Sequence, residues 1–286
     1  MAQINLLDEI SLPGSPERVN EDALGATGTI AFVLDGVTGL ADTPLLAGKS
    51  DAAWVSGLAR DLLLEHGPGR GGDLRGLIKI VAEGIAERFL RDRLRAPAEP
   101  YEMPWTTLSM IGIESDTLHI AYLGDSRIVA ETVDDEIHNF GTNPTRSAFE
   151  QKLSAKVVAG GKGLGVDVIR ATVLPELRRA RNMVNTQSGF WLLGADPAAA
   201  AHAGVTSLKL SGGPATVLLA TDGFYALKED YAVFDDRDLV ATGQTLGLAN
   251  MAAQLRRIED GDPMGEVYPR MKKSDDATAL LVRVSP

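Results

Sequence analysis

The chain contains no cysteine, and this absence limits the chemistry that it can perform. Without a thiol it has no disulfides, no thiolate zinc site and no cysteine nucleophile. Any catalysis must therefore depend on oxygen or nitrogen ligands.

Long apolar runs and an excess of positive charge are also missing. No stretch reaches the roughly 18 apolar residues that a membrane-spanning helix needs, and the first 23 residues are acidic and lack the apolar core of a signal peptide. We therefore expect a cytoplasmic protein that does not bind membranes. The net charge of −11, from 28 basic and 39 acidic residues, disfavours nucleic acid as a partner.

The composition is that of a soluble globular protein. Apolar residues make up 44% and charged residues 23% of the 286 positions, enough for a sizeable core. One large domain over residues 1–286 is the simplest organisation, with a divergent insertion at about 134–203 placed over a sheet edge. Within that insertion lie a glycine-rich stretch (159–165) and an arginine run (Arg178, Arg179, Arg181) that is typical of a solvated helix face.

Several apolar, strand-like runs begin or end at acidic residues. Three runs lead into Asp35-Gly36, Gly124-Asp125 and Asp222-Gly223, and a fourth follows Asp275-Asp276; the runs are 28–34, 118–123, 215–221 and 277–284. Each Asp-Gly pair alone is more often an ordinary turn. Together they predict acidic side chains at the ends of core strands.

The other segments predict a mixed α/β fold. Helical spacing and N-capping residues indicate helices from Ser50 to Glu65 and from Asp73 to Leu94. Short intervals between the strand-like segments favour antiparallel pairing. The further expected strands are 105–112, 128–133 and 205–210, and a last helix is expected over 241–258.

The aspartates at these strand ends predict a metal site. Converging carboxylates repel one another unless a cation lies between them, so we expect a cation near Asp22, Asp35, Asp222 and Asp275. Oxygen ligands suit magnesium, manganese or calcium rather than zinc. Glycine after Asp35 permits close backbone approach, which makes the Gly36 carbonyl a further candidate ligand.

Five short motifs, in order along the chain, resemble the type 2C, metal-dependent serine/threonine phosphatase family in its bacterial-like form. They are NEDA (20–23), VLDGVTG (33–39), YLGDSR (122–127), ATDGF (220–224) and SDDAT (274–278). The resemblance implies an α+β fold, a four-layer αββα sandwich of two antiparallel sheets flanked by helices. It also implies a phosphorylated protein as substrate and two Mn²⁺ or Mg²⁺ ions as cofactors.

The resemblance assigns roles to individual positions. Asp35 would bridge both metals and, with Asp222, form the catalytic centre, while Gly36 would offer its carbonyl and Asp275 would bind one metal. Glu21 and Asp22 would bind the second metal, largely through water, and the metal-bridging water would attack phosphorus. Asp125 is a candidate ligand for a third, weaker metal; the alternative, that it orders its turn and pairs with Arg127, stays open.

Three positions depart from the family pattern. The phosphate-binding arginine is commonly four residues before the glutamate of the Glu-Asp pair, but that position is Glu17 here and the candidate, Arg18, is shifted by one. Val37 stands where animal members have a proton-donating histidine, so water or another group must protonate the leaving alkoxide. Ala226 replaces an acid that supports the third metal, which predicts a weak or missing third site.

Two other functions remain open at this point. One is a catalytically weak or inactive phosphatase-fold protein that binds a partner, although the retained aspartates argue against it. The other is a phosphatase of small phosphoesters. The sequence does not determine the oligomeric state.

Overall fold

The computed structural model of the chain describes residues 2–141, 153, 166–210 and 212–286. The glycine-rich stretch 159–165 lies outside the described residues. The strands are β1 (Gln3–Leu12), β2 (Ala23–Ala26), β3 (Ile30–Leu34), β4 (Trp105–Thr106), β5 (Leu108–Glu114), β6 (Thr117–Leu123), β7 (Arg127–Glu131), β8 (Ile137–Phe140), β9 (Leu193–Gly194), β10 (Gly204–Lys209), β11 (Ala215–Ala220) and β12 (Ala277–Ser285). The helices are α1 (Asp51–His66), α2 (Leu74–Asp92), the short 3₁₀ helix Pro100–Glu102, α4 (Val166–Arg181), α5 (Ala199–His202), α6 (Asp222–Glu229), α7 (Asp236–Leu246) and α8 (Leu248–Gly261).

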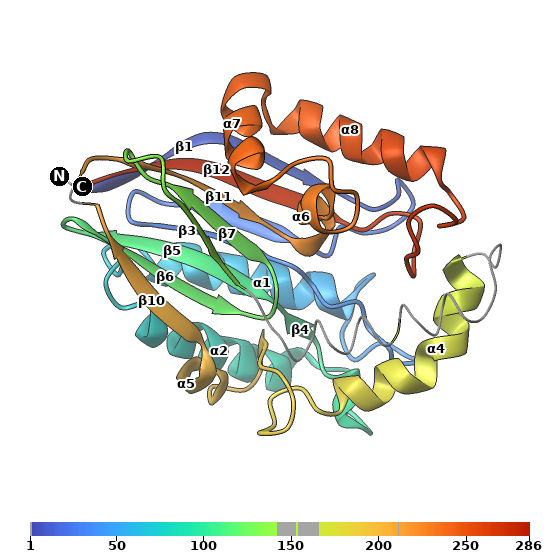
Figure 1. The fold of residues 1–286 in the computed structure, drawn as a ribbon. Coiled ribbons are helices and arrows are strands. Elements are labelled where there is room, and N and C mark those ends of the chain that lie inside the picture. Colours follow the sequence, from blue (N-terminus) through green and yellow to red (C-terminus); the bar gives the residue numbers. More distant parts are fainter. Residues whose placement is uncertain (1, 142–152, 154–165, 211) are drawn as a thin grey trace.

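Two five-stranded antiparallel sheets face each other at the centre of the molecule (Figure 1). Their strand orders are β1-β12-β11-β7-β8 and β10-β6-β5-β3-β2. Helices α1 and α2 pack on the second sheet, with α5 against α2, whereas α6, α7 and α8 pack on the first. The expected four-layer αββα sandwich is confirmed.

Alternating side chains of the central strands build this sandwich. In β3, Ile30, Phe32 and Leu34 pack toward the helices, while Ala31 and Val33 pack into the layer between the sheets. A strand covered on both faces needs apolar residues at every position, which is why the β3 segment is a continuous apolar run. The helix caps also form as expected: Ser50 accepts a hydrogen bond from the backbone N–H of Ala53, and Asp73 from that of Gly76.

Three sequence expectations need correction. The segment 241–258 is not one helix, because Gly247, with φ of 82°, separates α7 from α8. Strands β6 and β7 are not hairpin partners, since the turn between them crosses from one sheet to the other and β7 pairs with β8 and β11. Strand β1 was not expected; it pairs with β12 and leaves many side chains exposed, which gives it little apolar pattern.

No helix among the residues that the structure describes is both long enough and apolar enough to cross a membrane.

Candidate metal centre

Three aspartates converge at one end of the sandwich. Asp35 follows β3, Asp125 lies in the turn after β6, and Asp222 is the first residue of α6, directly after β11. One carboxylate oxygen from each lies within 4.8 Å of the others, and all three residues are half-buried. The structure thus joins Asp35 and Asp222 as expected and adds Asp125, whose metal-binding role the sequence left open.

Buried hydroxyl groups link the turn of Asp35 to that of Asp125. The backbone N–H of Thr107 donates to the Asp35 carbonyl at 2.9 Å, and the Thr107 hydroxyl lies 2.6 Å from that of Ser126. Ser109 donates to the Ser126 carbonyl at 2.6 Å. Because buried hydroxyls with partners hold a fixed geometry, these bonds fix the separation of the two aspartates.

Glycine is required on both Asp-Gly turns. A Cβ on Gly36 would lie 2.3 Å from the Glu21 carbonyl oxygen, and a Cβ on Gly223 would lie 2.0 Å from that of Asp276. Both distances are far below contact distance. The NEDA and SDDAT segments therefore pack directly against the aspartate turns.

Glu21 and Asp22 contact the segments that carry Asp35 and Asp222, but they are not part of the three-aspartate group. The Glu21 carboxylate accepts hydrogen bonds from Thr38, at 2.5 Å, and from Ser50. Asp22 accepts one from the Thr221 hydroxyl at 2.9 Å. These bonds engage both carboxylate oxygens of Glu21, and its role beside a metal-bound water stays a prediction.

Burial raises the pKa of the Asp22 carboxyl well above its ordinary value, and the negative charge of Asp275 raises it further. A buried carboxyl with this shift gains most from a nearby cation, because the cation stabilises its ionised form. The donor set therefore fits a hard divalent ion on its oxygen chemistry and its electrostatics.

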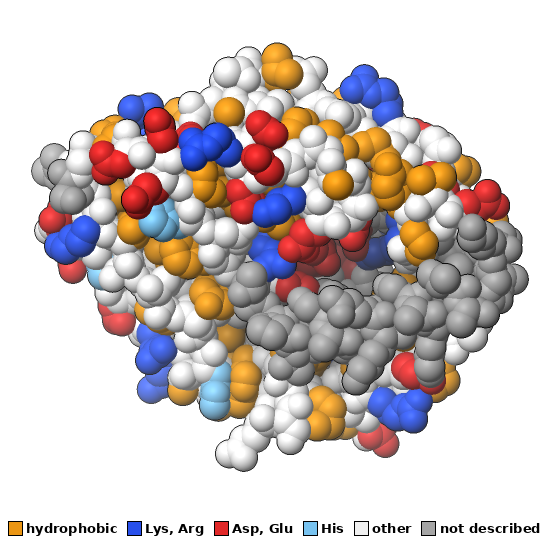
Figure 2. All heavy atoms as spheres, viewed as in Figure 1, with side chains coloured by type: hydrophobic (Ala, Val, Ile, Leu, Met, Phe, Trp, Pro, Cys, Tyr) orange, Lys and Arg blue, Asp and Glu red, His pale blue; other side chains and the backbone are white. Residues whose placement is uncertain are grey.

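A cavity of about 210 Å³ opens beside the aspartates. Its lining has an acidic part, Asp35, Asp222 and Asp275, and a larger apolar part: Val37, Leu40, Leu153, Leu177, Ala180 and Phe190. A second cavity of about 240 Å³ shares Asp222 and Asp275 and extends to Asp125 and Ala226. In Figure 2, acidic side chains flanked by basic ones gather in a hollow near the middle of the face.

Two basic side chains of this cavity were not predicted from the sequence as site residues. Lys272 forms an ion pair with Asp275, and Arg181 lies on the wall, with Nη1 3.4 Å from the Thr38 carbonyl oxygen. Burial lowers the pKa of Lys272, but the charges of the surrounding carboxylates outweigh it and raise the pKa above its ordinary value. The only sequence signal for Lys272 was its place three residues before Asp275.

The prediction that the arginine run forms a solvated helix face needs correction. Arg179 is largely exposed, as expected, but Arg178 donates to the Leu40 carbonyl and to Asp42 and lies over the Tyr101 ring. These contacts and those of Arg181 attach the end of α4 to the segment after Asp35.

Two other expectations concern Arg18 and Arg127. Arg18 is exposed in a turn and does not line either cavity, so its phosphate-binding role stays a prediction. Arg127 donates to Glu229, and its guanidinium lies over the Tyr225 ring.

No protein-family model matches the chain, and a search of curated proteins gives no match. Solved structures do match over nearly the whole chain. The catalytic domain of the serine/threonine protein phosphatase PstP, in complex with two manganese ions, is 19% identical, with a TM-score of 0.57 and 100% of both chains covered. The Mycobacterium tuberculosis phosphatase PstP/Ppp is 18% identical, with a TM-score of 0.57, covering 99% of this chain and 98% of that chain.

PppA, a regulatory component of the type VI secretion system in Pseudomonas aeruginosa, is 17% identical, with a TM-score of 0.52, covering 99% of this chain and 98% of that chain. At these identities the likeness shows a shared fold. The chain has the two-sheet fold of bacterial serine/threonine phosphatases.

Proposed function

We propose that the protein is a metal-dependent phosphatase that hydrolyses phosphoserine and phosphothreonine in proteins. The observation that carries this proposal is the convergence of Asp35, Asp125 and Asp222 at one end of a sandwich whose solved relatives include serine/threonine phosphatases. Three carboxylates this close together repel one another, and a divalent cation would offset that repulsion.

The residues that would hold two Mn²⁺ or Mg²⁺ ions are Asp35, Asp222, Asp275 and the Gly36 carbonyl, with Glu21 and Asp22 acting largely through water. Asp125 would hold a third ion. Ala226 supplies no carboxylate to that position, although Glu229 and Asp230 line the same cavity. When bound, such ions make a coordinated water more acidic and neutralise charge on the phosphoryl group.

The chain's own side chains orient the substrate. The acidic part of the cavity lining excludes a phosphoryl group unless cations are present, whereas the apolar part suits the hydrocarbon parts of a peptide. Val37 offers no proton beside Asp35, so we assign protonation of the leaving alkoxide to water. The proposal includes a role in cytoplasmic signalling through a phosphoprotein. This role is inferred from the sequence alone.

The test is hydrolysis of a phosphothreonine peptide and of p-nitrophenyl phosphate. We expect turnover with Mn²⁺ or Mg²⁺, loss of turnover after chelation, recovery when either ion is restored, and no requirement for zinc. Faster turnover of the peptide supports a protein substrate, whereas a preference for the small ester favours the small-phosphoester alternative. Full activity after exhaustive chelation would overturn the metal mechanism, and absence of turnover under every condition would favour a binding protein.

A further inference from the structure

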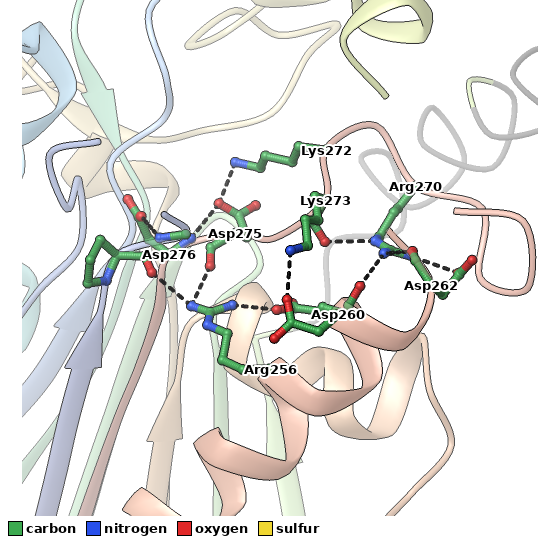
Figure 3. Close-up of polar contacts among 11 residues, drawn as sticks. Arg256, Asp260, Asp262, Arg270, Lys272, Lys273, Asp275 and Asp276 are labelled. Carbon is green, nitrogen blue, oxygen red and sulfur yellow. Dashed lines mark hydrogen bonds and ion pairs between the residues drawn. The ribbon is translucent and has the colours of Figure 1, made fainter. Parts of the chain in front are cut away.

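Two consecutive lysines before the SDDAT motif point to different partners (Figure 3). The ammonium group of Lys272 pairs with Asp275 in the candidate metal centre. That of Lys273 pairs with Asp260 at 2.6 Å, near the end of α8, although the residue also lines the second cavity. The side chains are 32% and 48% exposed, so both are reachable from solvent, but only Lys272 lines both cavities with Asp222 and Asp275.

The loop that carries Lys272 is fixed on both sides. Arg270 donates to the Lys273 carbonyl at 2.8 Å and to the Asp262 carboxylate at 2.9 Å. Arg256 donates to the Asp275 carbonyl at 2.8 Å and to that of Pro13 at 3.1 Å. Figure 3 shows these contacts on either side of Lys272. A lysine on a loop held in this way loses less freedom when it binds a ligand.

The ammonium group of Lys272 can form further hydrogen bonds. Lysine carries three N–H donors, so one bond to Asp275 leaves two for oxygens in the cavity. A compact ammonium group is also a common partner of phosphate. Arg18, by contrast, is exposed and lies outside the lining of both cavities.

We propose that Lys272 binds the phosphoryl group of the substrate, in the role that the family pattern gives to an arginine before the Glu-Asp pair. This inference rests on the proposed phosphatase function. Lys272 holds Asp275 through one donor and directs its charge at phosphate oxygens through the others. It contributes mainly to substrate binding, because its charge is present before and throughout the reaction.

The experiment compares Lys272→Met, which removes the charge and keeps the length, with Lys272→Arg and with Lys273→Met as the matched control. We expect Lys272→Met to raise KM for a phosphothreonine peptide by at least about tenfold, the usual scale for a charge-assisted hydrogen bond, with a smaller change in kcat. Lys272→Arg should recover part of the loss, and Lys273→Met should match the wild type.

A second readout does not depend on turnover. Titration calorimetry with inorganic phosphate in the presence of Mn²⁺ should show at least about tenfold weaker binding to Lys272→Met, while Mn²⁺ alone binds at least as tightly because a competing positive charge is gone. If phosphate binding and KM are unchanged and only Mn²⁺ affinity changes, Lys272 is merely a counter-ion of the carboxylates and the inference is wrong. A wild type that binds phosphate with Mn²⁺ but shows no turnover would sink the phosphatase proposal, and the calorimetric comparison would still decide the role of Lys272.

Discussion

Acidic side chains occur in two neighbouring regions of the molecule under opposite electrostatic conditions. At the strand ends, Asp35, Asp125 and Asp222 point oxygens at one another. Beneath the loop that leads to Asp275, the buried Glu259 and Asp262 each face an arginine, at 2.7 Å and 2.9 Å. In the first region three carboxylates share one small volume, which suits a bound cation, whereas in the second each carboxylate has its own arginine.

In the second region, Asp262 is held in its ionised form. The Asp262 carboxylate accepts backbone N–H bonds from Glu266, Val267 and Tyr268 in addition to its bond from Arg270. Burial raises the pKa of Asp262, but these bonds outweigh burial and lower it to about 2. The arginine-paired carboxylates shape the loop, whereas the clustered carboxylates at the strand ends suit a ligand.

The largest effect on turnover is expected from removing the charge of one of the three clustered carboxylates, that of Asp35. Asp35→Asn keeps the shape but removes the carboxylate expected to touch both ions. Loss of residues that only support metal ligands costs about 10- to 100-fold in affinity or activity, so we expect a larger loss of turnover. Without metal, the variant should melt no lower than the wild type, because repulsion with Asp125 and Asp222 is relieved.

The measurement is a pair of melting curves with and without Mn²⁺, alongside an activity assay. Near-normal turnover, or a clearly destabilised metal-free variant, would remove Asp35 from the centre and contradict the contrast between the two regions.

For Asp262, in the arginine-paired region, we expect the opposite: a loss of stability that exceeds the loss of turnover. Asp262→Asn leaves Arg270 without its counter-charge, and breaking a buried pair in this way costs about 3 to 5 kcal/mol of unfolding free energy. Turnover at a temperature where the variant is folded should fall much less than in Asp35→Asn. Urea unfolding gives the stability, and a variant as stable as the wild type would show that this network does not shape the loop.

The pH dependence has a defined sign. Because the folded-state pKa of Asp262 is lowered, its contribution to stability is complete above its unfolded pKa of about 4 and is lost as the pH falls toward 2. The wild type should therefore lose more stability than Asp262→Asn over this interval. Urea midpoints at several pH values measure the difference, and parallel curves would contradict it.

The smallest effect is expected at Arg18, whose charge belongs to neither region. Arg18→Ala should change KM by only a few fold, because the side chain is exposed and outside the cavity linings. Steady-state kinetics measure this change. A loss above about a hundredfold would show that Arg18 reaches the phosphate after all and would weaken the case for Lys272.

Much of the fold followed from local patterns. Continuous apolar runs revealed β3, β11 and β12, because strands covered on both faces carry mostly apolar side chains. Strand β1 was missed because its mostly exposed or half-buried side chains leave a weak pattern. The break at Gly247 was missed because a single glycine within a helical pattern is often tolerated.

The sequence by itself determined a mixed α/β fold with antiparallel pairing and carboxylates at its strand ends, since an apolar run and the acidic residue that follows it are neighbours in the chain. The two-sheet sandwich came from the resemblance of five motifs to a known family. Only the tertiary structure decided that Asp125 joins Asp35 and Asp222, because the turn at Asp125 passes between the two sheets. It also decided that Lys272 and Arg181 line the same cavity as Asp35. These contacts join segments far apart in the sequence, and their geometry depends on how two sheets and their loops pack, which no local pattern encodes.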